Sequence, residues 1–334
     1  MQLRNRSIAV FGAGSWGTAL SMVLAKNDQH VRLWDRDQSL LLEIERAGEN
    51  TRYLPGVSLP KRIVICHTLE QALENVNDIL IVVPSHAFVE ALRELKVFLT
   101  TQHRIIWATK GLEPDTGHFL HQVVERECGM TQHYAVLSGP SFAKEVALGL
   151  PTAVMIASKD FLFASELANY FGRDTFKVER TDDVIGVELG GVIKNVLAVA
   201  VGVSDGVGFG ANTRAALITM GLMEMMRLGK AVGARSETLM GLAGCGDVIL
   251  TCTDNQSRNR RFGLALAEGL SETEVLQRIG QVVEAVYNVE QLCHLAKLFH
   301  VELPIVEQVF RIIKRNISPR EAIGALFEQV PIGV

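Results

Sequence analysis

The chain has 334 residues, of which 48% are hydrophobic and 21% charged, and these proportions are typical of a folded globular protein. They exclude disordered, collagen-like and coiled-coil proteins. Lysines and arginines number 33 against 37 aspartates and glutamates, so the net charge is −4 and no overall positive field would attract nucleic acid or an anionic membrane. We therefore expect neither partner, and an anionic ligand must be bound by local charges.

The five cysteines are odd in number and form no C-x-x-C pair, which argues against a disulfide framework or a zinc site. The apolar run that follows Met1–Arg6 is too short for the core of a signal peptide. The longest uninterrupted apolar run, Val196–Val203, is too short to span a bilayer and is typical of a core helix. We expect a cytoplasmic protein with no bound metal.

In the first half of the chain, short β-branched runs alternate with segments of helical periodicity. The predicted strands are Ile8–Phe11, His30–Trp34, Ile63–Cys66, Ile79–Val83, Ile105–Ala108 and Ala135–Leu137. The predicted helices are Thr18–Lys26, Leu40–Ala47, Leu69–Val76 and Phe88–Phe98, and Thr68 with Gln71 has the spacing of a helix start. Such alternation indicates parallel strands that are joined by crossover helices.

A glycine-rich loop separates the first strand from the first helix. Its sequence, Gly12-Ala13-Gly14-Ser15-Trp16-Gly17, matches G-x-G-x-x-G, which indicates dinucleotide binding only in this strand–loop–helix context. Glycines allow a tight turn and close approach, so that a pyrophosphate can reach the free N–H groups at the positive end of the helix. A loop that only packs the helix on the strand is the alternative.

Asp35 and Arg36 follow the second strand, where such a chain meets the adenosine ribose. An acidic residue there favours the free 2′-hydroxyl of NAD, whereas an arginine can hold the 2′-phosphate of NADP. We expect Arg36 to contact the adenosine end. The choice between NAD and NADP stays open, and both charges could instead be solvated.

After Asp183 the β-branched runs stop, and helical segments continue with glycine clusters at Gly206–Gly210 and Gly241–Gly246. We predict an α/β protein with two domains. Residues 1–185 would form a Rossmann-type dinucleotide-binding domain with a doubly wound, mostly parallel sheet, and residues 186–334 an all-helical substrate and catalytic domain.

Ligands of a doubly wound sheet bind outside the carboxyl ends of its strands. Three such ends are candidates, namely Val83–His86, Ala108–Gly111 and Ser138–Ala143. Lys110 could direct its ammonium group toward an anionic or carbonyl substrate there, or it could be a surface lysine. His86 could contact the cofactor or be solvated, while His118 and His121 are expected to form a surface pair on one helix face.

Lys194 is the only charged residue between Leu189 and Ser204, in a segment that is apolar on all sides. Its ammonium group must reach solvent, pair with a carboxylate or serve a site. Burial and a nearby cation such as Lys110 would both lower its pKa toward neutrality, where a lysine can exchange protons. The pattern favours a functional lysine.

Two further segments carry polar residues at helical positions. Asp247 and Thr251 are four residues apart and would share a helix face, as site residues or as a capping aspartate and an ordinary threonine. The run Ser257–Asn259 lies at a helix start and offers a hydroxyl, a guanidinium and free N–H groups to a phosphate. Arg260 and Arg261 are expected to form a solvated face.

Taken together, these motifs resemble those of NAD(P)-dependent glycerol-3-phosphate dehydrogenases of the soluble bacterial type. The resemblance rests on GAGSWGTA from Gly12, RYLPGV from Arg52, ATKGLE from Ala108, SGPSFAKEV from Ser138, ELGGVIKNVLAVAVG from Glu188, GLAGCGDVILTCT from Gly241, SRNRRFG from Ser257 and VVEA from Val282. The ordered set spans residues 12–285 with spacing similar to that of the family.

The resemblance implies reduction of dihydroxyacetone phosphate to sn-glycerol 3-phosphate by NAD(P)H, for glycerophospholipid synthesis, in a homodimer. Lys194 would donate and accept the proton, with Asp247, Asn195 and Thr251 supporting it and Lys110 at the substrate and nicotinamide. The implied substrate contacts are Lys110, Gly139, Ser141, Lys194, Asp247, Ser257, Arg258 and Asn259. The implied cofactor contacts are Gly12, Gly14, Ser15, Trp16, Arg36, Lys110, Ala143, Arg258, Val282 and Glu284.

Two other functions share parts of this pattern. A hydroxyacid or phosphosugar-acid dehydrogenase could use the same layout, but Ser257–Asn259 suits a terminal phosphate and does not require a carboxylate. A non-catalytic NAD(P)-sensing protein would keep the glycine loop but would not need Lys194 in an apolar helix. Asp35 is less usual in the family and argues against a strict preference for NADP.

Overall fold

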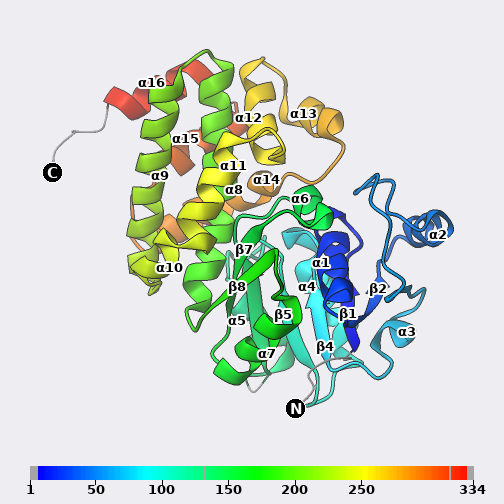
Figure 1. Cartoon of the computed structure of the whole chain (residues 1–334). Coiled ribbons are helices and arrows are strands. Elements are labelled where there is room, and N and C mark those ends of the chain that lie inside the picture. The colour runs from blue at the N-terminus through cyan, green and yellow to red at the C-terminus, as the bar shows by residue number, and fades with distance from the viewer. Residues whose placement is uncertain (1–6, 131, 316, 329–334) are drawn as a thin grey trace. The chain divides into compact units, whose positions relative to one another are not determined.

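The computed structural model describes residues 7–130, 132–315 and 317–328, so Met1–Arg6, which bear on the expected lack of a signal peptide, lie outside them. The chain forms two compact units (Figure 1). The sheet unit comprises Met1–Thr109 and Leu120–Val187, and the helical unit comprises Lys110–Phe119 and Glu188–Val334. The short segment with Lys110 therefore belongs to the helical unit, although its sequence neighbours belong to the sheet unit.

The sheet unit contains one eight-stranded sheet in the order β3-β2-β1-β4-β5-β6-β7-β8. Its strands are β1 (Ser7–Phe11), β2 (His30–Trp34), β3 (Ile63–Ile65), β4 (Asp78–Ile81), β5 (Arg104–Trp107), β6 (Tyr134–Ser138), β7 (Thr152–Ala157) and β8 (Phe176–Thr181). All neighbouring strands are parallel except β6 and β7. The predicted doubly wound, mostly parallel sheet is confirmed, and β7 and β8 extend it beyond the predicted strands.

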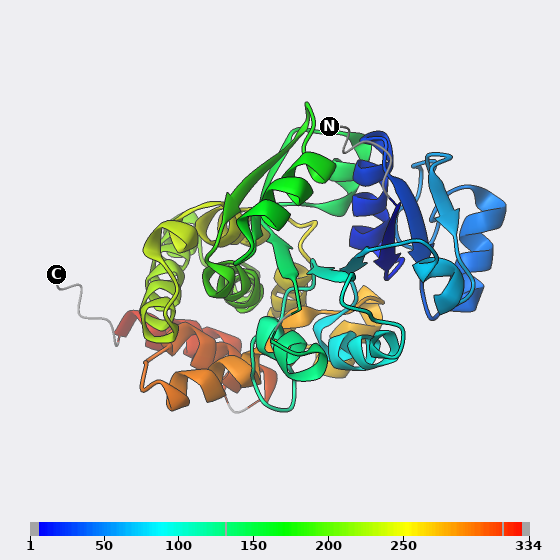
Figure 2. The same ribbon diagram turned by 90° about the horizontal axis from the view of Figure 1, so that it is seen from below.

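Helices cover both faces of this sheet (Figure 2). They are α1 (Ser15–Lys26), α2 (Gln38–Ala47), α3 (Leu69–Leu73), η1 (Ser85–Ala87), α4 (Phe88–Lys96), α5 (Leu120–Cys128), α6 (Ala143–Leu148) and α7 (Phe161–Phe171). Thr68 caps α3, as predicted, by accepting a hydrogen bond from the Gln71 N–H.

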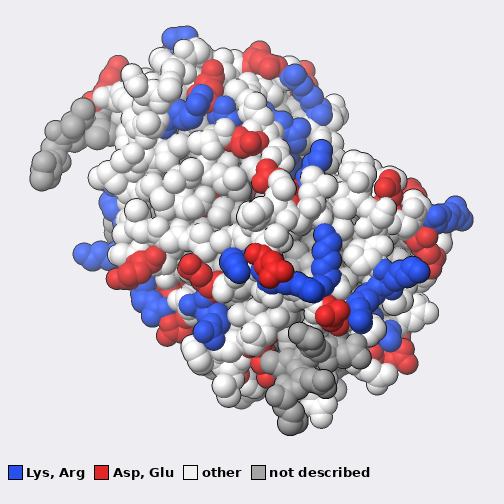
Figure 3. Space-filling view, in the orientation of Figure 1, with Lys and Arg blue, Asp and Glu red and all other residues white. Residues whose placement is uncertain are grey.

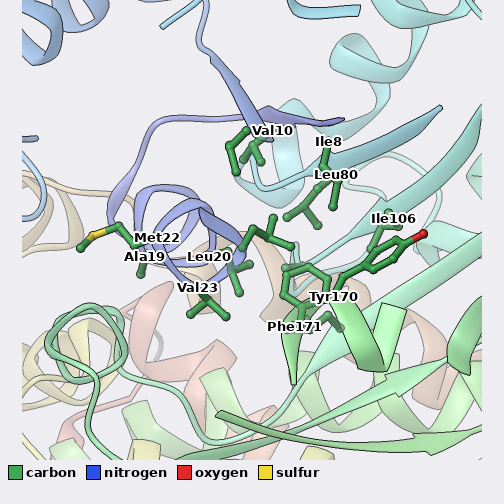
Figure 4. Packing of buried hydrophobic residues seen from close by; sticks show 14 of the residues in the cluster. Ile8, Val10, Ala19, Leu20, Met22, Val23, Leu80, Ile106, Tyr170 and Phe171 are labelled. Carbon is green, nitrogen blue, oxygen red and sulfur yellow. The ribbon is translucent and has the colours of Figure 1, made fainter. Parts of the chain in front are cut away.

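The core of the sheet unit follows from the alternation of side chains along each strand. Val10 of β1 and Leu80 of β4 lie in one buried cluster with residues of α1 and α7, including Leu20 and Phe171 (Figure 4). The next residues along the strands face the other side, where the ring of Trp107 in β5 meets one neighbouring ring edge-on and another at a tilt. Burial on both faces fixes the sheet and therefore the loops at its carboxyl end.

The helical unit is built around α8 (Val184–Gly206), which begins within the last residues of the sheet unit. The following elements are α9 (Ala211–Val232), α10 (Ser236–Met240), the π-helical turn η2 (Leu242–Gly246), α11 (Asp247–Thr253), α12 (Arg258–Ala267), α13 (Glu272–Ile279), α14 (Glu284–Leu298), α15 (Pro304–Ile313) and α16 (Pro319–Glu328). In its described part this unit contains no named strand, as predicted.

Helix α8 is long and apolar enough to cross a membrane by length and composition, although the sequence shows only short uninterrupted apolar runs. Within its most apolar window, 89% of the helix is buried inside the protein, which is the pattern of a core helix.

On the face drawn in Figure 3, acidic and basic side chains are interspersed. A mixed surface of this kind agrees with the near balance of charges in the sequence.

Glu224 of α9 has a buried side-chain carboxyl group that caps another helix. Its Oε1 accepts a hydrogen bond of 2.6 Å from the N–H of Ile305 in the first turn of α15, and its Oε2 accepts a longer one of 3.4 Å from Val306. Burial raises the pKa of Glu224 to about 7, although both hydrogen bonds favour the ionised form. The folded protein therefore holds a proton on Glu224 that the unfolded chain releases near pH 4.5.

We expect the contribution of Glu224 to stability to be full below pH 4.5 and to be lost as pH rises toward 7. The Glu224→Gln variant lacks this titration. Between pH 5 and pH 8, the free energy of unfolding of the wild type should fall by about 2–3 kcal/mol more than that of the variant. Urea unfolding at both pH values measures this difference. Glu307→Gln, on an exposed position of α15, is the control, and an unchanged pH dependence in Glu224→Gln would contradict the prediction.

Candidate functional site

The glycine loop of the sheet unit requires its glycines. Gly12 has a φ of +113°, and a Cβ there would lie 2.5 Å from the carbonyl oxygen of Val82. A Cβ on Gly17 would lie 1.9 Å from the carbonyl oxygen of Gly12. Helix α1 begins after Gly14, so the N-cap has no side chain, and the first turn contains no acidic residue. The N–H groups at this helix start therefore suit the pyrophosphate of a dinucleotide.

The other residues proposed to contact the cofactor in this unit follow the carboxyl ends of strands of the same sheet. Trp16 packs against the hydrophobic core, and its buried Nε1 has no hydrogen-bond partner among the described residues. Arg36 is exposed and forms an ion pair with Glu90 of α4. His86 is exposed in η1, and Arg36 acts on it electrostatically. Ala143 begins α6.

Two residues predicted to bind substrate follow β6 in the sheet unit. Gly139 has a φ of +141°, and a Cβ there would lie 3.0 Å from the Cα of Val154 in β7. Ser141 donates a hydrogen bond of 3.0 Å to the carbonyl oxygen of Gly139. The turn after β6 is thus tightly held, and its geometry depends on the glycine.

The helical unit brings four of the predicted residues into direct contact around one carboxylate. The Nζ atom of Lys110 lies 2.6 Å from Oδ2 of Asp247, and the Nζ atom of Lys194 lies 3.2 Å from Oδ1. Lys194 also donates a hydrogen bond of 3.1 Å to the Thr251 hydroxyl, which donates in turn to the backbone oxygen of Asp247 at 2.6 Å. We call Lys110, Lys194, Asp247 and Thr251 the lysine cluster.

The lysine cluster is almost completely removed from water. The side chain of Asp247 is 2% exposed, that of Lys194 11% and that of Lys110 14%. Burial lowers the pKa of Lys194 to about 8, helped by the neighbouring ammonium group of Lys110 and opposed by the carboxylate. Burial alone would raise the pKa of Asp247, but the two ammonium groups hold it below its usual value. The cluster therefore joins one buried carboxylate to the side-chain nitrogens of two lysines.

Close approach of two helical segments positions this cluster. Gly190 lies one helical turn before Lys194 on α8, and a Cβ there would lie 2.2 Å from the carbonyl oxygen of Ala243. Ala243 belongs to η2, which leads directly into α11 at Asp247. A π-helical turn is rare and is often found at functional sites. Here the tight packing at Gly190 brings the helix with Lys194 next to the helix with Asp247.

Lys110 is held in the helical unit by contacts of its own segment with α14. The N–H of Leu112 donates a 3.2 Å hydrogen bond to Oδ1 of Asn288, which is completely buried. The side-chain amide of Gln291 donates to the carbonyl oxygen of Pro114. Asn288 and Gln291 were not predicted as site residues, because nothing in the local sequence of α14 indicates what they contact.

Asn195 and Asn259 form a chain of hydrogen bonds between three helices. The N–H of Ala285 in α14 donates to Oδ1 of Asn259 at 3.1 Å, and the Asn259 amide donates to Oδ1 of Asn195 at 2.8 Å. The Asn195 amide donates to the carbonyl oxygen of Gly191. Both side chains are buried, so each holds a fixed orientation next to residues that were predicted to bind ligands.

The remaining predicted residues lie at the starts of α12 and α14. Ser257 caps α12, where its hydroxyl accepts a hydrogen bond of 3.2 Å from the Arg260 N–H. Arg258 has an exposed side chain; partial loss of solvent around its guanidinium lowers its pKa, and the carboxylate of Glu284 opposes that shift. Val282 lies two residues before Glu284, the first residue of α14. Arg258 and Glu284, from the starts of two different helices, thus attract each other electrostatically within the helical unit.

Two expectations from the sequence were wrong. Arg260 is buried, because its guanidinium forms a 2.5 Å ion pair with Asp205 and donates to Asn255 Oδ1 and the Cys252 carbonyl oxygen. His118 lies in the loop before α5 and only His121 is helical, so they do not share a helix face, and His121 is buried rather than at the surface. Among the described residues, no group of three or more His, Cys, Asp or Glu could hold a metal.

Two models of one protein family match most of the chain. The model of the NAD-dependent glycerol-3-phosphate dehydrogenase N-terminus matches residues 7–164, and that of the C-terminus matches residues 183–324. The chain belongs to this family. Glycerol-3-phosphate dehydrogenase [NAD(P)+] of Haemophilus ducreyi is 50% identical over 97% of each chain. The protein of the same description from Pseudoalteromonas translucida is 48% identical over 98% of each.

Solved structures agree with this family assignment. The crystal structure of glycerol-3-phosphate dehydrogenase from Coxiella burnetii superposes with a TM-score of 0.95 at 48% identity, covering 98% of this chain and all of that one. The enzyme from Saccharomyces cerevisiae gives 0.79 at 27% identity, with 96% and 98% covered. A ketopantoate reductase from Ralstonia eutropha gives 0.61 at 15% identity, with 95% and 99% covered, and this likeness shows the fold alone. The likeness to this reductase therefore does not support the alternative of a hydroxyacid dehydrogenase.

Replacing Arg260 with methionine should destabilise the protein by about 3 kcal/mol, because the variant removes the 2.5 Å ion pair of the buried Asp205, whose other ion pair is with the more exposed Arg214. Urea unfolding of the variant and the wild type measures the loss. Arg261→Met, at an exposed position of the same helix, is the control and should change stability by less than about 0.5 kcal/mol. Equal effects of the two substitutions would show that burial of Arg260 has no energetic weight.

Proposed function

We propose that the protein catalyses the reversible reduction of dihydroxyacetone phosphate to sn-glycerol 3-phosphate with NAD(P)H, and so supplies glycerophospholipid synthesis. The observation that carries this proposal is the buried lysine cluster, in which the carboxylate of Asp247 pairs with two ammonium groups and one of them, that of Lys194, has a pKa of about 8. The family match and the similarity to glycerol-3-phosphate dehydrogenases of other bacteria support the substrate.

The two predicted domains have different main tasks in this proposal. Residues 1–185 supply most of the nucleotide contacts, and residues 186–334 supply most of the substrate contacts and the lysine that transfers the proton. Because Lys110 is held within the helical unit, it serves the second task despite its position in the sequence. The residues proposed to contact the nucleotide are Gly12, Gly14, Ser15, Trp16, Arg36, Lys110, Ala143, Arg258, Val282 and Glu284.

Bound NAD(P)H supplies a hydride, and reduction of a ketone carbon leaves an alkoxide that needs electrostatic stabilisation and a proton. Lys194 donates that proton, since its lowered pKa lets it exchange protons near neutral pH. Lys110 stabilises the developing negative charge. Asp247 and Thr251 hold the ammonium groups in place through the hydrogen bonds described above, and Asn195 is fixed beside Lys194 by Asn259.

The substrate phosphate is proposed to bind at the start of α12, where Ser257, Arg258 and Asn259 lie together. Arg258 is exposed and offers a planar guanidinium to two phosphate oxygens. The buried side-chain amide of Asn259 is already hydrogen-bonded to Ala285 and Asn195. Its part in this proposal is therefore to orient the helix start. Gly139 and Ser141 complete the proposed set of substrate contacts. Binding of the phosphate would hold the reacting carbon in place and so lower the activation barrier.

We place the enzyme in the cytoplasm as a homodimer that acts on a small molecule and binds neither nucleic acid nor a membrane. The near balance of charges supports the absence of polyanionic partners. Burial of α8 supports its role as a core helix.

A substrate comparison tests the function directly. The absorbance of the reduced nicotinamide is followed with dihydroxyacetone phosphate, with glyceraldehyde 3-phosphate and with a 2-keto acid as oxidants. We expect turnover with the first compound to exceed that with the others by at least a hundredfold. Folded protein that binds nucleotide but does not turn over dihydroxyacetone phosphate would defeat the proposal.

The lowered pKa of Lys194 predicts opposite pH dependences for the two directions. Reduction needs the protonated amine and should decline above about pH 8, whereas oxidation needs the neutral amine and should rise through the same range. Asp247→Asn removes the anion that favours the ammonium form, so the decline in reduction should move to lower pH. Lys194→Met should lower kcat at least a thousandfold, while the Kd for NADH changes less than twofold. Lys230→Met on the surface of α9 is the control, and profiles of kcat against pH that do not differ between wild type and Asp247→Asn would exclude this role of the carboxylate.

Arg258→Ala should raise KM for dihydroxyacetone phosphate at least tenfold, because a charged hydrogen-bond donor to the phosphate is lost. Steady-state kinetics at saturating NADH measures KM and kcat separately. Arg278→Ala, whose side chain pairs with Glu268 on the exposed surface, is the matched control. A KM that stays at the wild-type value would remove Arg258 from the phosphate site.

A further inference from the structure

We infer that this protein prefers NADH to NADPH, and that the residue responsible is Asp35. The inference rests on the proposed nucleotide-binding function and goes beyond it by naming the group that discriminates. In a fold of this kind the residue after the second strand meets the adenosine 2′ position. Asp35 follows β2 directly and offers a carboxylate there.

The carboxylate of Asp35 is fixed by two backbone groups. Its Oδ2 accepts a hydrogen bond of 2.7 Å from the N–H of Ala13 in the glycine loop, and its Oδ1 accepts one of 2.9 Å from the N–H of Asp37. These bonds tie the end of β2 to the middle of the glycine loop. Each oxygen can still accept a further hydrogen bond, so the ionised group can bind the 2′-hydroxyl of NADH without leaving its place.

The peptide that holds Asp35 is itself immobilised from the other side. Asn50 is completely buried, and its amide donates to the carbonyl oxygen of Ala13 at 2.7 Å and to the Thr18 hydroxyl at 2.8 Å. Its Oδ1 accepts a hydrogen bond from the N–H of Tyr53. Asp35 therefore cannot turn away from an incoming phosphate unless it gives up its bond to a rigid loop. A 2′-phosphate would meet a negative charge that stays in place.

Arg36, the residue that could attract a 2′-phosphate, is held in a different way. It forms a 3.0 Å ion pair with Glu90, and both side chains are more than 60% exposed. A pair so exposed is weak, so Arg36 can leave Glu90, but its charge is partly compensated where it lies. A fixed anion thus competes with a mobile, partly compensated cation. We expect the fixed anion to dominate, with NADPH bound more weakly but not excluded.

Isothermal titration calorimetry of the full-length protein with NADH and with NADPH tests this, because it measures binding without turnover. In the wild type, Kd for NADPH should exceed Kd for NADH at least tenfold. Asp35→Asn keeps an oxygen that can accept from Ala13 but removes the charge, so the ratio of the two constants should fall at least fivefold. Asp35→Ser serves the same purpose if the amide variant does not fold.

Glu90→Gln separates the two charges. It removes the partner of Arg36 and leaves Asp35 in place, so Kd for NADPH should fall by a factor of two to five while Kd for NADH stays within twofold. Thermal unfolding of each variant checks that the fold is intact. Equal affinity of the wild type for both nucleotides, or an unchanged ratio in folded Asp35→Asn and Asp35→Ser, would overturn the inference. A wild type that binds neither nucleotide would contradict the proposed function itself, and the inference with it.

Discussion

Two ammonium groups share one buried carboxylate in the helical unit, and the remaining features of that unit serve this contact. Without Asp247, the cations of Lys110 and Lys194 would repel each other in a region with little water to screen them. Three neighbouring features bring the partners together: the close approach at Gly190, the π-helical turn before α11 and the attachment of the Lys110 segment to Asn288. Burial disfavours the charged form of Lys194 and so lowers its pKa, while the carboxylate of Asp247 keeps the buried ammonium group tolerable for the fold.

The two units prepare for ligands by different physical means. The sheet unit relies on backbone geometry, because the glycine loop needs positive φ at Gly12 and close contact at Gly17, and the buried amide of Asn50 supports it. The helical unit relies on buried polar side chains whose hydrogen bonds are satisfied by other helices, as in the chain from Ala285 through Asn259 to Asn195. Backbone loops suit a cofactor recognised by its phosphates, whereas buried charges suit proton transfer.

The sequence predicts those parts of the protein that have a local pattern. Strands β1 to β6 are short apolar runs that the sequence pattern reveals, and Lys194 stands out as the only charged residue between Leu189 and Ser204. β8 escaped prediction because Lys177, Glu179 and Arg180 interrupt it on an edge of the sheet. The burial of Arg260 was not predicted because its partner Asp205 is distant in the sequence. The hydrogen bond between Asn50 and Ala13 also joins residues that are far apart in the sequence. Partnerships across long separations leave no trace in a single sequence.

The path of the chain has a practical consequence for anyone who wishes to dissect the protein. Because Lys110–Phe119 belongs to the helical unit, the backbone passes between the units three times, after Thr109, after Phe119 and after Val187. A fragment cut at the apparent boundary near residue 185 would lack one of the two cations and leave Asn288 without its partner at Leu112. Exchanging the nucleotide-binding half with that of another enzyme would likewise have to retain these ten residues from the original chain, or the acceptor half would lose part of its own interior.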